Sequence, residues 1–261
     1  PILATLKRHK TAAGLIVLQV ALTCAIVCNA LFLISQRMER IDEPSGLAES
    51  EIVEITVSGL SRSQDPDATT RADLEVLRRV PGVKSVATVN QFPYGDNFSS
   101  SSIRLKPEEL GVGEKSINAA NYFVSDGWLQ TMGLKQVAGR DFNGDEYQNL
   151  SDAESAVAPD IPAVVINRAL AERLFPNAEA VGQSVYVFDS APSRVVGVVE
   201  RLVSPQPGGT SDSQRYSMVF PARPHFRGGS DRPRAASAQR EGALTAAVAE
   251  MMKVDGQRVV R

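Results

Sequence analysis

The chain of 261 residues is long enough for one large domain or two modest ones. Hydrophobic residues make up 43% and charged residues 22%, which excludes a wholly disordered or collagen-like chain. The net charge of −2 excludes the strong positive field of a nucleic-acid-binding protein. The chain has two histidines, His9 and His225, and two cysteines, Cys24 and Cys28. This leaves few ligands for a metal site and few residues for a catalytic triad.

Residues 12–34 carry no charged side chain. As a helix they would be about 34 Å long, against a hydrocarbon core of roughly 30 Å, so they predict a transmembrane helix. A cleaved signal peptide is the alternative, but its apolar stretch is normally about 7–15 residues long, which favours an anchor. Gln19 and Asn29 either face partner helices or are tolerated in the membrane. Cys24 and Cys28 lie on one helical face at a spacing that favours packing over a disulfide.

Charges beside this segment predict its orientation. Lys7, Arg8 and Lys10 precede it, whereas Arg37 and Arg40 follow it together with acidic residues. The positive-inside rule therefore favours a cytoplasmic N-terminus in an inner membrane, with the rest of the chain periplasmic or extracellular. Residues 1–40 hold five of the 28 basic and one of the 30 acidic residues, so the remainder is mildly acidic, with 23 basic and 29 acidic residues.

We therefore predict four regions. Residues 1–11 form a cytoplasmic flank, 12–34 the membrane helix, 35–50 a connector and 51–261 an extracytoplasmic domain. That domain contains no cysteine, so it folds without disulfides. We expect it to be of the α+β class, a mixed domain built from βαβ-like units in two subdomains.

The first unit is a compact βαβ arrangement. The alternating residues 51–57 predict a half-buried strand, Asp67 is expected to cap a helix that ends near Val80, and residues 83–90 return as a strand. The polar stretch 91–102 that follows is either a binding loop or a solvated excursion, and the second is favoured.

The middle of the chain predicts strands at 102–106 and 116–124. Between them, GVGEKS at 111–116 resembles a phosphate-binding loop, but Glu114 stands where the Walker pattern needs glycine, which argues against nucleotide binding. A short helix at 126–133 and a turn at 139–142 follow. Residues 143–162 are polar and acidic, and we expect a surface insertion there.

A second unit, of βαββ type, begins at residue 163. Asn167 should cap a helix that ends at Leu174, and strands are expected at 163–166, 183–188 and 194–203. The run VVGVV at 195–199 is apolar on both faces, as in a central strand. Gly197 within it indicates the close approach of a neighbour, for which the 167–174 helix is the candidate.

The last part of the chain predicts a strand at 216–220 and a helix at 242–253. Between them, residues 223–240 are rich in arginine, proline and glycine. This stretch could bind an anionic partner, but a solvated loop is the default. We expect low tolerance to mutation at Gly197 and high tolerance in residues 223–234.

Three blocks of residues resemble the MacB-type periplasmic core domain of FtsX-like ABC-transporter permeases, preceded by that family's first membrane helix. They are the segments YFVS at 122–125 with Trp128, Leu129, Thr131, Met132, Gly133 and GRDF at 139–142; VVIN at 164–167 with Leu170, Ala171, LFP at 174–176, Val181 and Gly182; and VVGVV at 195–199. Their order and spacing also fit. The polar insertion and the arginine-rich stretch depart from the family pattern.

The resemblance implies a permease subunit with four membrane helices and a large domain between the first and the second, so the chain would be truncated. It implies export or mechanotransmission driven by a separate or fused ABC-type ATPase. It further implies a second permease copy, in a homodimer or heterodimer, and a possible periplasmic adaptor protein. Antibiotics, peptides and lipids are candidate cargoes. No catalytic, cofactor-binding or metal-binding residue is then expected, and the chain is not itself an enzyme.

Two other functions are considered for the chain. A single-pass sensor or adaptor could use the same outer domain to bind an envelope ligand or protein. A membrane-bound hydrolase is disfavoured because the chain has no GxSxG or HExxH motif. Three further apolar runs downstream would identify the permease, because each membrane helix needs about 20 apolar residues.

Overall fold

The computed structural model describes residues 10–41, 44–59, 65–95, 98–107, 117–151, 160–188, 191–205, 215–224, 232–238, 249–250 and 258–260. The chain divides into two compact units, Pro1–Pro44 and Ser45–Arg261. The GVGEKS segment and nearly all of the helix predicted at 242–253 lie outside the described residues.

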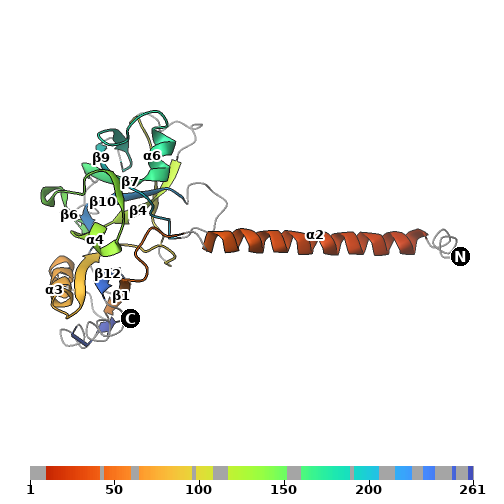
Figure 1. The fold of residues 1–261 in the computed structure, drawn as a ribbon, viewed down its shortest axis with the longest axis horizontal. Helices are drawn as coiled ribbons and strands as arrows, with labels where there is room; N and C mark the ends of the chain where they lie inside the picture. Colours follow the sequence, from red (N-terminus) through yellow and green to blue (C-terminus); the bar gives the residue numbers. More distant parts are fainter. Residues whose placement is uncertain are drawn as a thin grey trace. The chain divides into compact units, whose positions relative to one another are not determined.

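The described residues of the first unit are almost entirely those of helix α2, Lys10–Ile41 (Figure 1). Its stretch Gly14–Ser35 has a mean hydropathy of 2.3, and none of it is buried. This is one helix long and apolar enough to cross a membrane, as a signal sequence near an N-terminus also is. Cys24 and Cys28 are free and exposed on it.

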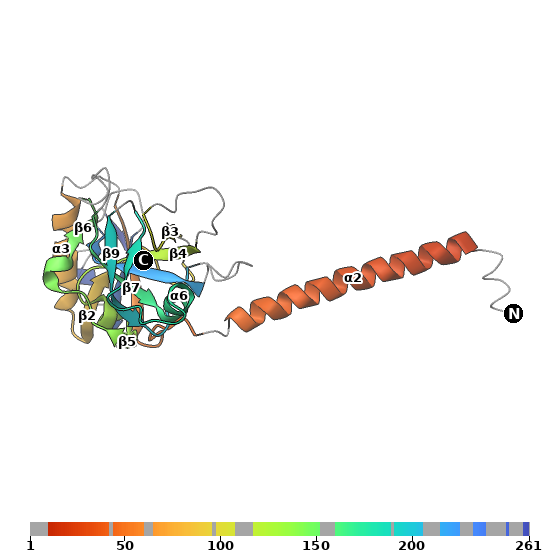
Figure 2. The same ribbon diagram turned by 90° about the horizontal axis from the view of Figure 1, so that it is seen from above.

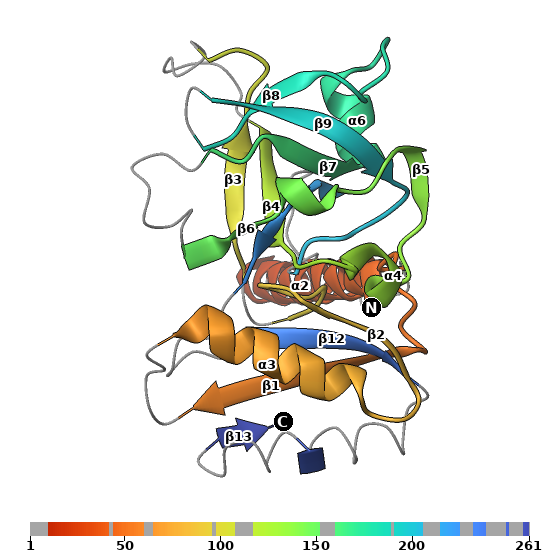
Figure 3. The same cartoon turned by 90° about the vertical axis from the view of Figure 1, so that its left-hand side faces the viewer.

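The second unit begins with a four-stranded antiparallel sheet of order β13-β1-β12-β2. Its strands are β1, Ile52–Gly59; β2, Val83–Thr88; β12, Arg232–Ala238; and β13, Arg258–Val260. Helix α3, Pro66–Arg78, connects β1 to β2 and lies across one face of the sheet (Figure 3). The predicted βαβ unit therefore exists, but β12 separates its two strands.

The position of β12 corrects the expectation for the arginine-rich stretch. A solvated loop was predicted for residues 223–240, whereas 232–238 pair with β1 on one side and β2 on the other. Arg232 and Arg234 are thus part of a central strand. Alternating strand patterns are easiest to recognise in apolar sequence, and RPRAASA offers none.

The cap of α3 also differs from the prediction. Asp65, not Asp67, accepts a hydrogen bond from the Ala68 amide at 2.9 Å. Pro66 occupies the first helical turn, where its fixed φ and missing N–H are tolerated, so the residue before it becomes the N-cap.

A seven-stranded sheet forms the rest of the unit, in the order β3-β4-β10-β7-β9-β5, with β8 also paired to β9. Its strands are β3, Ser100–Ile103; β4, Ile117–Phe123; β5, Gln136–Gly139; β7, Ala163–Asn167; β8, Ser184–Tyr186; β9, Pro192–Val199; and β10, Ser217–Phe220. The predicted central position of VVGVV is confirmed, because β9 pairs with β7 on one edge and with β5 and β8 on the other.

This sheet closes on itself. Arg104, next to the end of β3, bridges to Tyr186 of β8 through reciprocal backbone hydrogen bonds of 3.0 and 2.9 Å. The sheet is thus a small barrel, which removes two strand edges. Helix α6, Arg168–Leu174, packs against β7 and β9 (Figure 2). As predicted, Asn167 caps it, accepting a hydrogen bond from the Leu170 amide at 3.0 Å.

Two stretches expected on the surface are partly buried. In the 91–102 loop, Gln91 is 1% exposed, donates to the Asn121 carbonyl at 3.0 Å and accepts from the Ser99 amide at 2.7 Å. In the 143–162 segment, Leu150 and Ile161 are buried. Directly before Leu150, β6, Gln148–Asn149, pairs in parallel with β11, Ala222–Arg223. Gln91 and Ser99 in the 91–102 loop, and the start and end of the 143–162 segment, are therefore anchored to the domain rather than being simple solvated excursions.

Three apolar clusters explain how the two sheets hold together. One lies between α3 and the four-stranded sheet, and one fills the barrel under α6. The third, which we call the shared core, joins residues from both sheets and from α4, Trp128–Met132, which lies between them (Figures 1 and 3). Its fully buried members include Trp128, Met132 and Tyr122. The α+β class is confirmed, with two sheets that share one core.

Candidate functional site

The GRDF turn, residues 139–142, is the point where three parts of the domain meet. Gly139 ends β5 with a φ of +69°, a left-handed conformation that favours glycine. A Cβ atom there would lie 2.2 Å from the Val196 carbonyl oxygen. The next amide, that of Arg140, donates to the same oxygen at 2.9 Å. The turn is therefore pressed directly onto β9.

Gly197 faces this turn from the other side. A Cβ atom on Gly197 would lie 2.3 Å from the Arg140 carbonyl oxygen. The prediction that Gly197 allows a close approach is confirmed, but the predicted neighbour was wrong. The approaching group is the backbone of the GRDF turn rather than α6, because β5 pairs with β9 at Gly139 and Gly197.

A bulge in β9 accompanies the crossing. Val195 pairs with Val164 and Gly197 with Val165, so Val196 is the extra residue. The bulge changes which way the strand points its side chains. Val195 and Val198 belong to the barrel interior, whereas Val196 and Val199 belong to the shared core.

Asp141 fixes the only tryptophan of the chain. Its carboxylate accepts hydrogen bonds from the Trp128 indole N–H at 2.9 Å and from the Phe142 amide at 2.7 Å. Phe142 packs against Trp128 and Tyr147 in the shared core. A fully buried indole needs such an acceptor, so Asp141 ties the turn to α4.

Two arginines, Arg140 and Arg223, form ion pairs beside the GRDF turn and Tyr147. Arg140 makes a two-point ion pair with Glu146 at 2.6 and 2.7 Å, and this hydrogen bonding holds the pKa of Glu146 below its usual value. Arg223 pairs with Asp126 at 2.7 Å and lies 5.0 Å from the centre of the Tyr147 ring. Burial is the main reason why the pKa of Tyr147 is raised. Arg223, expected in a loop, thus joins β11 to the start of α4.

The connector after α2 enters the domain beside this cluster. Ser45 is 1% exposed, and its carbonyl accepts a hydrogen bond from the Val203 amide at 3.2 Å. The Ala48 amide donates to the Met132 carbonyl at 3.0 Å. Close contacts make glycine necessary at two positions here: a Cβ on Gly46 would lie 2.2 Å from the Arg201 carbonyl oxygen, and one on Gly133 would lie 2.4 Å from the Ala48 Cβ. The connector is therefore fixed to α4 and to the segment after β9.

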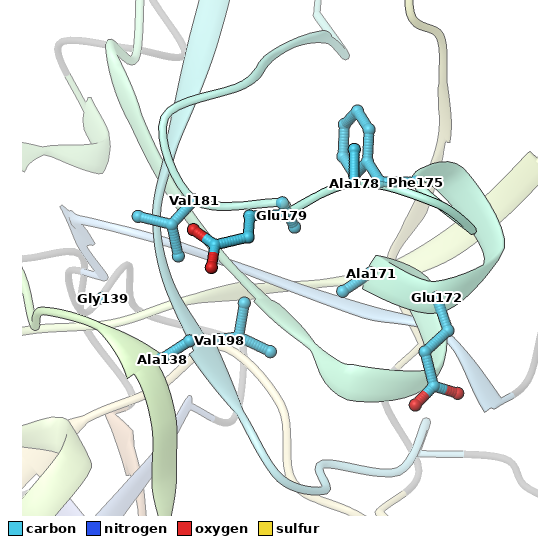
Figure 4. A pocket seen from close by; sticks show the side chains of 10 residues that line it. Ala138, Gly139, Ala171, Glu172, Phe175, Ala178, Glu179, Val181 and Val198 are labelled. Atoms are coloured by element: carbon cyan, nitrogen blue, oxygen red, sulfur yellow. The ribbon is translucent and has the colours of Figure 1, made fainter.

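A shallow pocket of about 400 Å³ lies between β5, β9 and α6 (Figure 4). Its lining is mostly apolar, and its two ionisable residues, Glu172 and Glu179, are both exposed. Among the described residues, no group of three or more histidine, cysteine, aspartate or glutamate side chains could hold a metal ion. The pocket therefore lacks the buried, converging polar groups of a typical enzyme site.

The matching family model decides which family this architecture represents. It is the model of the MacB-like periplasmic core domain, and it matches residues 15–253. The chain belongs to this family. The resemblance found in the sequence is thereby confirmed, and the GRDF turn, Asn167 and VVGVV are built into the body of the MacB-like domain.

Solved structures are similar to the chain at low identity. They include the extracellular domain of the noncanonic ABC-type transporter YknZ from Gram-positive bacteria, at 16% identity and a TM-score of 0.47, over 80% of this chain and 100% of that one. The periplasmic region of MacB from Actinobacillus actinomycetemcomitans matches at 16% and 0.46, over 85% and 93%. A domain of a putative permease protein from Porphyromonas gingivalis matches at 16% and 0.48, over 84% and 91%. A search of the curated proteins found no match.

Sequence reasoning found the residues of the GRDF turn but not their contacts. The Gly139–Gly197 crossing and the Asp141–Trp128 hydrogen bond join residues from separate elements, and the sequence contains no local sign of them. The connector was predicted as a simple link, although Gly46 and the buried Ser45 make it part of the domain. A glycine next to a serine predicts a turn, and this pattern gives no indication of close packing.

Proposed function

We propose that the chain is the first membrane helix and the extracytoplasmic domain of an ABC-transporter permease. In this proposal α2 crosses the inner membrane with its N-terminus in the cytoplasm. ATP is hydrolysed by a separate ATPase subunit or domain, and the resulting movement reaches the outer domain for export or mechanical signalling. The observation that carries the proposal is the family match, which starts within α2 and extends over nearly the whole outer domain.

The fixed connector supports a mechanical role. A movement of the helix can be transmitted to the domain only if the link between them does not simply bend when the helix moves. Residues 45–48 are hydrogen-bonded to α4 and to the segment after β9, and α4 belongs to the shared core. A displacement of the connector therefore reaches both sheets rather than one loop.

The partners follow from the same proposal. They are an ABC-type ATPase and a second permease copy, with a periplasmic adaptor protein as a further candidate partner. Co-purification of the natural full-length gene product with an ATPase, and ATP turnover that depends on the permease, would test this. A gene product that ends after this domain and purifies without an ATPase would instead favour the single-pass sensor or adaptor.

Membrane orientation has its own test. A reporter that is active only outside the cytoplasm, fused after Gly46, should be active. Activity from a cytoplasmic reporter at the same site would invert the topology. Release of a soluble, shortened product would identify α2 as a signal sequence.

Nucleotide binding gives a further test. The chain alone should show no saturable binding of ATP by calorimetry, since its only segment resembling a phosphate-binding loop, at 111–116, lacks the Walker spacing. Saturable binding at micromolar concentrations would contradict the assignment of ATP hydrolysis to a partner.

A further inference from the structure

One edge of β5 has no partner strand in the described part of the chain. There β5 pairs with β9 alone and ends the path of the seven-stranded sheet. The strand has four residues, with a bulge between Gln136 and Ala138, and both features limit indiscriminate pairing at a sheet edge. A segment that pairs with this edge makes a short backbone contact, so its side chains have to supply most of the selectivity.

The shallow pocket beside β5 lies within reach of such a segment. Ala138 and Gly139 of β5 form one wall, and Ala171 and Phe175 belong to the opposite wall (Figure 4). Because Ala138 carries only a methyl group and Gly139 has no side chain, neither blocks the way from the open edge into the pocket. Opposite residues of paired strands have Cβ atoms about 5 Å apart, so a long apolar side chain on an added strand can lie over β5 and enter the pocket.

Two carboxylates give the pocket its chemical preference. Glu172 and Glu179 line it and are both exposed. Figure 4 shows them on different sides, Glu179 beside Val181 and Glu172 beyond Ala171. Among the described side chains, none forms an ion pair with either glutamate. An apolar pocket between two carboxylates favours an occupant with positive charge on both sides of an apolar group.

Basic side chains in the neighbouring segments do not neutralise these carboxylates. Those outside the pocket lining are Lys135, Arg140, Arg168, Arg173 and Arg194. Lys135 and Arg168 pair with Glu200, and the pair of Arg140 is with Glu146. The chain after Ile41 is also acidic as a whole, with 23 basic and 29 acidic residues, so it attracts a basic segment over a longer range.

We propose that the open edge of β5 and the pocket together bind an extended segment of another protein. In this segment an apolar residue has a lysine or arginine two positions away on each side, because alternate residues of a strand share one face. The backbone of the segment extends the sheet at β5, the apolar side chain fills the pocket, and the basic side chains pair with Glu172 and Glu179. This inference goes beyond the proposed function and does not depend on the insertion of α2 into a membrane.

The first test uses the whole chain in non-ionic detergent and the synthetic peptide TKTLTKT, acetylated and amidated at its ends. We expect saturable binding by calorimetry, together with slower backbone hydrogen exchange in residues 136–139. The peptide TETLTET, with the opposite charges, and the peptide TKTSTKT, without the apolar side chain, should both bind more weakly.

Backbone methylation of the peptide tests for strand pairing. In a strand, successive backbone N–H groups point to opposite edges, so those at every second position pair with β5. We therefore expect N-methylation of one peptide position at a time to weaken binding at alternate positions and to have little effect between them. A peptide that binds only through its charges and its leucine would not show this alternation.

Variants of the protein locate the site. Glu172→Gln combined with Glu179→Gln should weaken binding of TKTLTKT about tenfold, because two exposed ion pairs are lost. Asp145→Asn combined with Asp160→Asn removes the same charge from two exposed residues outside the pocket lining and should have a much smaller effect.

A filled pocket is the second kind of variant. Ala178→Trp places a large side chain at an exposed lining position and should abolish binding. Asn177→Trp is the matched control, since Asn177 is the exposed neighbour outside the lining. Melting curves of all variants confirm that each remains folded.

Several outcomes would overturn the proposal. They are the lack of saturable binding of TKTLTKT, equal binding of TETLTET, uniform effects of N-methylation along the peptide, and equal affinities of the Ala178→Trp and Asn177→Trp proteins. None of these results bears on the association of the chain with an ATPase or on its membrane topology, so the proposed function is tested separately.

Discussion

The two larger sheets of the second unit, Ser45–Arg261, are assembled from the chain in different ways. All strands of the barrel lie between Ser100 and Phe220, whereas the four-stranded sheet combines β1 and β2 with β12 and β13 from the far end of the chain. The barrel is mostly local and strongly apolar, and its strands were largely predicted from sequence. The four-stranded sheet depends on a distant strand with no apolar pattern. Local sequence therefore indicates local pairing well and distant pairing poorly.

Gly197→Leu is the strongest way to break the barrel. Any side chain at this position meets the Arg140 carbonyl in the GRDF turn, and both sides of the contact are backbone. We expect the free energy of unfolding to fall by about 3 kcal/mol or more, measured by thermal or denaturant melts. Gly144→Ala is the matched control, since nothing lies within 4 Å of the added Cβ atom. An unchanged melt for Gly197→Leu would contradict the crossing with Gly139.

Ala236→Pro tests the four-stranded sheet. Ala236 lies in the central strand β12, opposite Val53 of β1 and Val86 of β2. Proline removes a backbone donor from the middle of a sheet, so we expect a loss of about 2 kcal/mol or more in the free energy of unfolding. Ala236→Ser keeps the amide and should cost much less. A tolerated proline would restore the view that this stretch is a loop.

Asp141→Ala tests the link between the sheets. It leaves the buried Trp128 indole N–H without its acceptor, so we expect a loss of about 1–3 kcal/mol. Trp128 is the only tryptophan, and its fluorescence reports this site directly. We expect a changed emission spectrum in the folded variant. Asp145→Ala is the control, because Asp145 is an exposed aspartate near the same turn. An unchanged spectrum and melt for Asp141→Ala would exclude the link.

Glu146→Gln is expected to have the smallest effect. The pair with Arg140 is partly exposed, with side-chain exposures of 17% for Glu146 and 45% for Arg140, so it contributes about 1 kcal/mol or less. The hydrogen bonds from Arg140 lower the pKa of Glu146 from its ordinary value of 4.5, so the stabilisation is present above that value. It is lost as the pH falls through the lowered pKa of the folded state. Melts of the two proteins should therefore differ at neutral pH and converge in acid, and a constant difference would contradict this assignment.

Particular residues show what the sequence could predict. Asn167 follows an apolar strand and precedes a short apolar helix, so its capping role follows from local pattern alone, and the structure confirms it. The buried central position of VVGVV was likewise predicted from the local sequence, a continuous apolar run. The family resemblance located the GRDF turn, because this sequence is characteristic of the family. The contacts that the turn makes could not be deduced from the sequence.

The missed features depend on contacts between distant parts of the chain. Gln91 reads as a polar loop residue, yet its amide satisfies backbone groups of β4 and of the loop before β3. The sequence around Arg223 predicts a solvated side chain, yet Arg223 forms an ion pair with Asp126 and lies over the ring of Tyr147. In both cases a polar side chain is paired within the domain, and only the fold supplies its partner.

The position of β12 in the chain also determines the order in which the domain can be completed. A ribosome releases β1, α3 and β2 first, but the strand that lies between β1 and β2 emerges only after the last barrel strand, β10. The barrel can thus close while the facing edges of β1 and β2 are still unpaired. During synthesis, those unpaired edges of the nascent chain are open to mispairing and to binding by chaperones. Maturation of the domain waits for a strand made near its end.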